Sequence, residues 1–235
     1  METDLLQNET RLFDILCHPN ALRLGFGDVK RNGGAQGIDG VTITTFHSKL
    51  EEELIQLSEE LRNWSYKPKP VRRIEIDKPD GGLRLLGIPC IRDRVVQATL
   101  KRLLEPILTP HFSAHSFGFI PGRNQTQAVE EAQRIIQSGK EWVVDIDLSK
   151  FFDRVHQDRL IGRLSESIND KRILRLIGLI LRSGTMKDGL VTPTLEGTVQ
   201  GSPLSPLLSN VVLDELDKEL ENRGLEFCRF ADDCN

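Results

Sequence analysis

Two apolar stretches of this sequence end in aspartates, and this pairing constrains the fold more than any other feature. The first stretch spans residues 141–148 and the second spans residues 225–231, and both are expected to be β-strands. The aspartates in or after them are Asp145, Asp147, Asp232 and Asp233. Alternate residues share one face of a strand, so Asp145 and Asp147 point the same way. Burying unpaired carboxylates is costly, so a metal ion, an Arg or Lys, or water must accompany them.

Two strands that both end in carboxylates favour a metal site more than either stretch does alone. Aspartate is also common in turns because its side chain bonds nearby backbone groups, which is an alternative explanation for Asp232 and Asp233. Magnesium takes oxygen ligands and usually binds substrate phosphates as well. Two such ions about 4 Å apart can activate a 3′-hydroxyl and stabilise a leaving pyrophosphate.

The remaining chain combines helices with one β-hairpin. Helical spacing of apolar residues predicts helices over residues 50–61, 95–108, 126–138, 157–168, 170–182 and 205–223. Alternating residues around Pro79-Asp80-Gly81-Gly82 predict a hairpin over residues 72–89. Lys78 and Arg84 flank its turn, where they either direct two cations at one anion or protect a strand edge from aggregation. Without strict alternation of strands and helices, the pattern indicates an α+β fold.

The charge distribution is uneven although the net charge is only −4. Residues 62–102 contain 11 Lys and Arg against 4 Asp and Glu, whereas the rest of the chain contains 20 against 31. This asymmetry suggests a polyanion on one side and carboxylate chemistry on the other, unless the charges cluster by chance. With four scattered cysteines, no secretory signal and no apolar run of about 18 residues, we expect a cytoplasmic protein without membrane contact.

The order of its motifs resembles the reverse transcriptases, or maturases, encoded by bacterial group II introns. The motifs are GIDGV at 37–41, RLLGIPCIRDRVVQ at 84–97, SFGFIPGR at 116–123, DLSKFFD at 147–153, VQGSPLSP at 199–206 and FADD at 230–233. The resemblance implies a right-hand polymerase, that is, an α+β fold with fingers and an antiparallel palm sheet with packed helices, the thumb being absent. Residues 1–45 would form an N-terminal extension and template-side loop, 46–140 the fingers, and 141–235 a palm truncated after the Asp-Asp turn.

The resemblance also implies roles for individual residues. Asp147 and Asp232, with Asp233 beside them, would be the catalytic metal ligands for Mg²⁺, or alternatively Mn²⁺. Asp145 lies outside the matched set and is interpreted as a structural acid. The residues implied to bind the nucleotide are Lys78, Arg84, Phe152, Gln200 and Gly201, and Arg72 is implied to bind template RNA. The ring of Phe152 would exclude a 2′-hydroxyl, unless it only packs in the core.

Several positions depart from the family pattern. Phe230 replaces a tyrosine, Val199 a proline, Ser202 a glycine and Ile120 an arginine. The sequence ends at Asn235, so we expect the Asp-Asp turn to lack its return strand. We also expect this chain alone to synthesise little or no long DNA.

Two functions remain open at this stage. In the first, the chain is the core of an RNA-directed DNA polymerase that adds dNTPs to a primer 3′-hydroxyl by two-metal phosphoryl transfer. In the second, it is a non-catalytic RNA-binding fragment that assists splicing. Expected partners are an RNA template, a DNA or RNA primer, dNTPs and the host intron RNA, and a homodimer is a further expectation. A nucleotide cyclase or a nuclease would explain the aspartates, but not the hairpin or the loop at Gln200.

Overall fold

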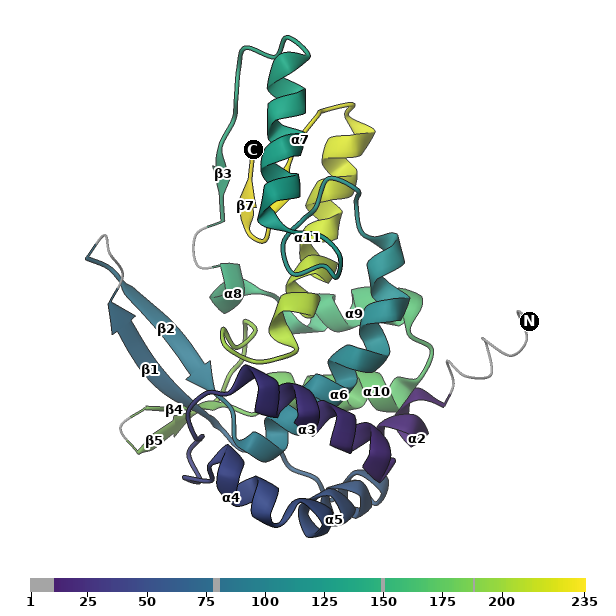
Figure 1. The fold of residues 1–235 in the computed structure, drawn as a ribbon, viewed down its shortest axis with the longest axis vertical. Helices are drawn as coiled ribbons and strands as arrows, with labels where there is room; N and C mark the ends of the chain where they lie inside the picture. The colour runs from purple at the N-terminus through teal and green to yellow at the C-terminus, as the bar shows by residue number, and fades with distance from the viewer. Residues whose placement is uncertain (1–10, 78–80, 149–150, 188) are drawn as a thin grey trace.

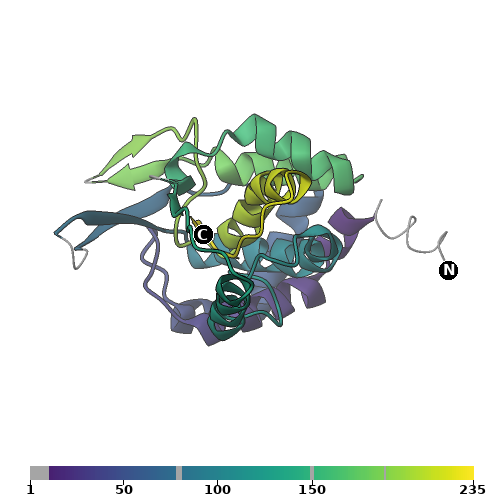
Figure 2. The ribbon, with the colours of Figure 1, turned by 90° about the horizontal axis from the view of Figure 1, so that it is seen from above.

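The computed structural model describes residues 11–77, 81–148, 151–187 and 189–235, with the side chain of Arg84 left out. Figure 1 shows a helical lower part, an upper part that contains the C-terminus, and hairpins that project to one side. Seen from above in Figure 2, the hairpins project from one side of the helical body. None of the described helices is both long enough and apolar enough to cross a bilayer.

The lower part is a set of helices packed around one apolar core. Its helices are α2 (Leu12–Leu16), α3 (Pro19–Asn32), α4 (Ile43–Ser48), α5 (Leu50–Arg62) and α6 (Ile91–Leu108). The leucines that recur along α5 are buried, as at Leu54, Leu57 and Leu61, while glutamates occupy its outer face. The expected helix at residues 50–61 is therefore confirmed, and the helix expected from residue 95 begins earlier, at Ile91.

The hairpin predicted over residues 72–89 is present and belongs to a larger sheet. Strands β1 (Val71–Asp77) and β2 (Leu83–Ile88) pair antiparallel, and β1 also pairs parallel with β4 (Thr185–Lys187). A second hairpin, which we did not expect from the sequence, joins β4 to β5 (Leu190–Thr192). The sheet order is β2-β1-β4-β5, so the two hairpins lie side by side (Figure 1).

The remaining helices connect the lower and upper parts. They are the 3₁₀ turn η1 (Thr109–His111), α7 (Gln125–Gln137), α8 (Phe151–Arg154), α9 (Gln157–Ser167), α10 (Lys171–Leu181) and α11 (Ser205–Asn222). Four of them confirm the expected helices within one or two residues at each end. Asn124 and Gln127 form a reciprocal capping box at the start of α7, which fixes where that helix begins. Buried leucines and isoleucines of α9, α10 and α11 join the same core as the lower helices.

A small antiparallel sheet lies in the upper part and differs from expectation in two ways. It consists of β3 (Ile146–Asp147), β7 (Asp233–Cys234) and β6 (Arg229–Phe230), with β7 in the middle. The expected absence of a return strand is wrong, because β7 returns from the turn and pairs with both neighbours. The strand expected over 141–148 is only two residues long, because a strand needs a hydrogen-bonded partner and β7 offers only two residues. The strand expected over 225–231 is shortened in the same way.

Candidate active site

A tight turn between β6 and β7 brings the acidic residues together. The register places Asp147 of β3 directly opposite Asp233 of β7, and Asp232 precedes Asp233 in the turn. Asp147 and Asp233, which are 86 positions apart in the sequence, are thus neighbours across one strand pair. Cross-strand neighbours have Cβ atoms about 5 Å apart, which is close enough for two carboxylates to share a cation.

Four carboxylates lie near one another at the end of this small sheet and repel each other. Asp145, Asp147 and Asp233 are exposed, and Asp232 is half-buried. Partial burial raises the pKa of Asp233, and the neighbouring carboxylates of Asp232, Asp147 and Asp145 raise it further. Within the described ranges, neither Asp145 nor Asp147 forms an ion pair with an Arg or Lys, so the salt-bridge alternative gains no support there.

Asp147, Asp232 and Asp233 offer only carboxylate oxygens, which are the type of ligand that a hard cation such as Mg²⁺ prefers. No three Asp, Glu, His or Cys side chains in the described part of the chain already converge as ligands. The backbone therefore collects the carboxylates at one place, and their side chains would have to turn toward one another to share an ion. Because burial first, and then the neighbouring carboxylates, raise the pKa of Asp233, a cation here would stabilise its charged form.

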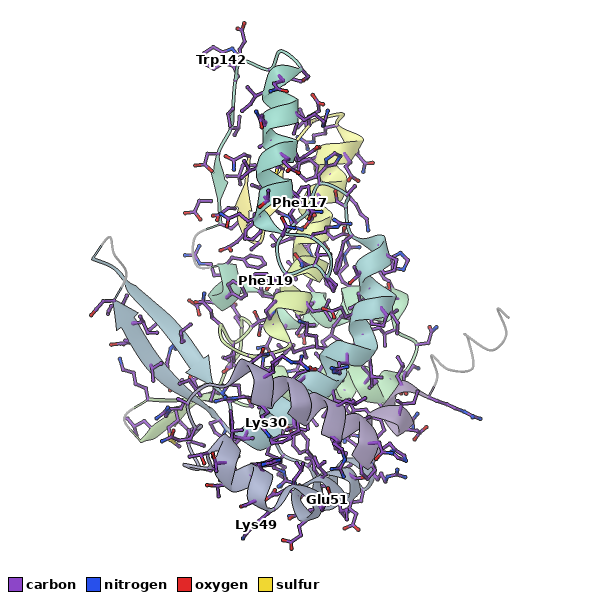
Figure 3. The ribbon with its side chains drawn as sticks, in the orientation of Figure 1. Lys30, Lys49, Glu51, Phe117, Phe119 and Trp142 are labelled. Atoms are coloured by element: carbon purple, nitrogen blue, oxygen red, sulfur yellow. The ribbon has the colours of Figure 1, made fainter. Side chains whose placement is uncertain are left out.

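A cleft of about 690 Å³ opens beside the acidic turn. Four of the residues implied to form the site line this one cleft, namely Phe152, Gln200, Gly201 and Asp232. These residues come from α8, from the loop before α11 and from the turn after β6. Phe119, which Figure 3 labels at mid-height in the molecule, contributes to the same lining. The fold thus brings three sequence-distant motifs to one cavity.

Close backbone contact fixes the loop that carries Gln200. The amide of Gly87, near the end of β2, donates to the carbonyl of Gln200 at 2.8 Å. Gly201 has φ +105°, and a Cβ atom there would lie 2.7 Å from the carbonyl oxygen of Gly87. Only glycine combines that dihedral with that approach, so Gly201 is required by the backbone geometry.

Phe152 is held at the cleft by its own backbone. Its carbonyl accepts a hydrogen bond from the amide of Thr198 at 2.7 Å, which ties α8 to the loop before Gln200. The neighbouring Phe151 packs against the main core, and the two rings meet edge to face at 5.5 Å. Of the two adjacent phenylalanines, Phe151 therefore contributes to the core and Phe152 to the cleft.

Two arginines, Arg94 and Arg72, lie close enough for their charges to interact. Arg94 lines the cleft and binds the carbonyls of Pro89 and Gly33 at 2.9 and 3.4 Å, and also that of Ala35. Burial lowers the pKa of Arg94, and the nearby positive charge of Arg72 lowers it further. The Nε atom of Arg72 is buried and, among the described residues, has no hydrogen-bond partner. Sequence analysis singled out Arg72 but missed Arg94.

The basic hairpin is described only in part. The Cα atom of Arg84 lies opposite Ile76 in the β1–β2 pair, while its side chain and the whole of Lys78 lie outside the described residues. Elsewhere in the basic segment 62–102, acidic residues from other parts of the chain neutralise part of the excess positive charge. Its ion pairs include Arg92 with Glu60, Arg102 with Asp28 and Lys69 with Asp39.

The structure describes the environment of each of the four residues that depart from the family pattern. Ile120 is buried in the main core, where its apolar side chain suits its neighbours. Val199 packs against Gly87, at which a Cβ atom would lie 2.3 Å from the valine. Phe230 is 37% exposed and Ser202 lines the cleft.

Comparisons with known proteins agree with this geometry. The family model described as reverse transcriptase (RNA-dependent DNA polymerase) matches residues 76–235. Protein YkfC of Escherichia coli is 38% identical over 221 residues, and group II intron-encoded protein LtrA of Lactococcus lactis subsp. cremoris is 33% identical over 221 residues. These alignments cover 92% and 94% of this chain, but only 58% of YkfC and 37% of LtrA.

A solved structure shares the fold. A chain of the partial Cas6-RT-Cas1–Cas2 complex superimposes with a TM-score of 0.60 and 25% sequence identity. The match covers 95% of this chain and 37% of that chain. It confirms the α+β architecture with a small antiparallel sheet and packed helices.

Proposed function

Because the chain belongs to the reverse transcriptase (RNA-dependent DNA polymerase) family, we propose that it carries the nucleotide-adding centre of an RNA-directed DNA polymerase. The observation that supports this most is the convergence at one cleft of Phe152, Gln200, Gly201 and Asp232, with Asp147 opposite the adjoining Asp233. Phosphoryl transfer depends mainly on positioning and charge neutralisation, and this arrangement offers both.

Asp147 and Asp232 would hold the divalent cation, with Asp233 beside them. Their oxygen atoms suit Mg²⁺, and Mn²⁺ is the alternative. When bound, the ion would activate the primer 3′-hydroxyl and neutralise the triphosphate. The three carboxylates make the strand end negative, and burial together with these neighbours raises the pKa of Asp233, so a cation there would offset both effects.

The walls of the cleft would select the incoming nucleotide. The half-buried ring of Phe152 is available to pack beneath the sugar, where a 2′-hydroxyl would collide with it. Gln200 and Gly201 would lie beside the nucleotide on the loop that Gly87 fixes. Lys78 and Arg84 would contact the triphosphate from the hairpin. Arg72, whose Nε has no partner in the described part of the chain, would bind template phosphate.

The proposed substrates follow from this centre, namely an RNA template, a DNA or RNA primer and dNTPs. The host intron RNA is the proposed further partner, because LtrA is named as a group II intron-encoded protein. The division into an N-terminal extension at 1–45, fingers at 46–140 and a palm from 141 also remains a proposal. A homodimer and a cytoplasmic location remain predictions.

Single-nucleotide primer extension tests the proposal. A DNA primer annealed to an RNA template with a single-stranded overhang is mixed with the chain, Mg²⁺ and one dNTP. We expect slow addition of the complementary dNTP, rejection of the other three, and no addition once EDTA removes the metal. Asp147→Asn and Asp232→Asn should each lower the rate by about 100-fold or more, since each removes a ligand.

A matched control separates chemistry from charge. Asp158→Asn removes an exposed carboxylate of α9 that pairs with Arg182, away from the cleft, and should leave the rate unchanged. Filter binding of the same RNA should persist in Asp232→Asn. If the wild-type chain adds no nucleotide while RNA binding is equal in all variants, the non-catalytic RNA-binding function replaces the polymerase.

A further inference from the structure

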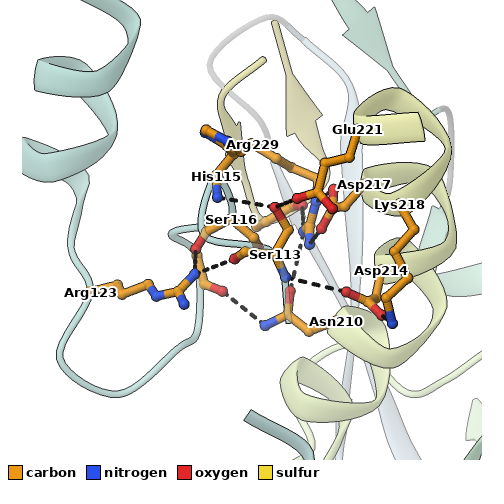
Figure 4. Close-up of polar contacts among 12 residues, drawn as sticks. Ser113, His115, Ser116, Arg123, Asn210, Asp214, Asp217, Lys218, Glu221 and Arg229 are labelled. Atoms are coloured by element: carbon orange, nitrogen blue, oxygen red, sulfur yellow. Dashed lines mark hydrogen bonds and ion pairs between the residues drawn. The ribbon is translucent and has the colours of Figure 1, made fainter. Parts of the chain in front are cut away.

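A fully buried arginine directly precedes the acidic turn. Arg229 of β6 is 0% exposed, and its guanidinium forms a two-pronged ion pair with Asp217 of α11, which is equally buried. Nε and Nη2 donate to the two carboxylate oxygens at 2.6 Å each. Figure 4 shows this pair among polar residues that come from α11, from β6 and from the segment before α7. Such paired, parallel hydrogen bonds fix the plane of a guanidinium.

The third nitrogen of the guanidinium reaches the acidic turn itself. Nη1 donates to the carbonyl oxygen of Ala231 at 2.6 Å and to Oδ1 of Asn210 at 3.2 Å. Ala231 has φ +59°, a left-handed conformation that is unfavourable for a non-glycine residue. Because Ala231 immediately precedes Asp232, its dihedral angles set where the two aspartates point.

The opposite side of the turn is closed by backbone contacts. The amide of Phe117 donates to the carbonyl of Arg229 at 2.8 Å, and the amide of Arg229 donates to the backbone carbonyl of His115 at 2.9 Å. A Cβ atom on Gly118 would lie 2.2 Å from the nitrogen of Ala231, so this loop packs directly on the turn. Asn210 donates to the carbonyl of Gly118 at 2.9 Å and thereby connects the loop to the guanidinium network.

The ion pair is a poor source of stability by itself. Burial raises the pKa of Asp217 although its hydrogen bonds to Arg229 and the charge of Arg229 oppose that change, so burial of this carboxylate costs free energy. Apolar residues of similar volume often replace such pairs without loss of stability. A geometric role explains why this one lies beside the turn.

We infer that Arg229 is a positioning residue: held by Asp217, it fixes Ala231 in the left-handed conformation and so holds the backbone of Asp232 and Asp233 beside Asp147, within reach of a shared cation. This inference rests on the proposed function, because it assumes that the three aspartates bind a cation. Arg229 would touch neither substrate nor metal.

Binding of Mn²⁺ to the isolated chain, measured from the electron paramagnetic resonance signal of free Mn²⁺, tests the inference without any assay of activity. Arg229→Lys keeps the charge but cannot make the fork to Asp217 and reach Ala231 together. We expect its Mn²⁺ affinity to fall about tenfold, the lower end of what loss of an orienting partner costs. Asp170→Asn is the matched control, because Asp170 is also buried and paired with an arginine, Arg172, but lies far along the chain from the turn.

A second substitution gives a readout that a purely structural role would not move. Glycine adopts positive φ freely, so adding Ala231→Gly to Arg229→Lys should restore part of the lost affinity. If Arg229→Lys does not fold, Ala231→Val tests the same point, because a β-branched residue resists φ +59° while the ion pair stays intact. That variant should also bind Mn²⁺ about tenfold more weakly.

The outcomes distinguish the two proposals. If Asp232→Asn binds Mn²⁺ as tightly as the wild type, the proposed metal site is wrong and the inference fails with it. If Asp232→Asn is weaker but Arg229→Lys and Ala231→Val match the wild type, only the positioning role is overturned. A weakened Arg229→Lys that Ala231→Gly does not rescue would also contradict it.

Discussion

At the scale of single residues, burial of one carboxylate outside the cleft has a measurable consequence. Asp93 of α6 is 2% exposed and accepts hydrogen bonds from the Tyr66 hydroxyl at 2.7 Å and from the Lys69 amide at 3.1 Å. Burial nevertheless raises its pKa from 3.8 to about 6. Because the folded state then binds more protons than the unfolded state, this group makes stability fall as pH rises from about 4 to about 6.

The prediction concerns Asp93→Asn, which cannot titrate. The wild type should lose on the order of 2–3 kcal/mol through this group across that pH range, and the variant should not. The stability deficit of the variant should therefore be largest near pH 4 and shrink toward pH 7, as measured by urea unfolding. A deficit that stays constant or grows with pH would show that the pKa of Asp93 is not raised.

Site residues that stand in short sequence motifs could be predicted from the sequence. Asp147, Asp232, Phe152 and Gln200 stand in short motifs, and the structure gathers three of them at one cleft with the fourth beside it. Arg229 was missed because its partner Asp217 lies twelve residues earlier, on the helix α11, and no local pattern pairs a helix residue with a strand residue. The available signal was an arginine flanked by the apolar residues Cys228 and Phe230, a position where a buried charge would need an ion-pair partner.

At the scale of elements, the crossing of α3 and α6 depends on one glycine. A Cβ atom on Gly25 would lie 2.1 Å from Oγ1 of Thr99 and 2.7 Å from the carbonyl oxygen of Val95. Gly27 lies in the same helix, but a Cβ atom there would meet nothing within 4 Å. The same substitution at these two positions should therefore have opposite effects.

Gly25→Ala should lower the free energy of unfolding by about 1–3 kcal/mol, because a backbone carbonyl cannot move aside as a side chain can. Gly27→Ala should raise it by about 0.5–1 kcal/mol, since alanine loses less conformational entropy in a helix. Guanidinium unfolding of the two variants beside the wild type measures both. Equal destabilisation of both variants would contradict the close packing of α3 on α6.

Helices were more predictable than strands for a physical reason. The buried leucines of α5 and the isoleucines and leucines of α10 repeat with the helical period, and a helix satisfies its backbone hydrogen bonds internally. The residues around β3 are apolar enough for a longer strand, but strand length depends on what pairs with it. The β4–β5 hairpin was missed because each of its strands is only three residues long, which is too short to show an alternation of apolar and polar residues.

At the scale of the whole molecule, one apolar core joins elements from Leu12 to Val211. This core runs from the proposed N-terminal extension into the proposed palm. The three proposed parts therefore share one hydrophobic core and differ in their proposed roles. The small β3-β7-β6 sheet stands apart from the core, in the upper part of Figure 1. Trp142, at the far end of that part in Figure 3, is 91% exposed. The overall α+β class followed from the sequence, whereas the pairing of β3 with β7 required the fold.

The most direct measurement of the central claim is cleavage of the chain by bound Fe²⁺ with ascorbate and peroxide, which cuts the backbone next to the ion. If Asp147, Asp232 and Asp233 share one cation, cuts should appear together near residues 147 and 232. Excess Mg²⁺ should suppress both cuts, and Asp232→Asn should abolish both. Cuts at only one of these segments, or cuts that persist in Asp232→Asn, would show that the aspartates do not form a common site.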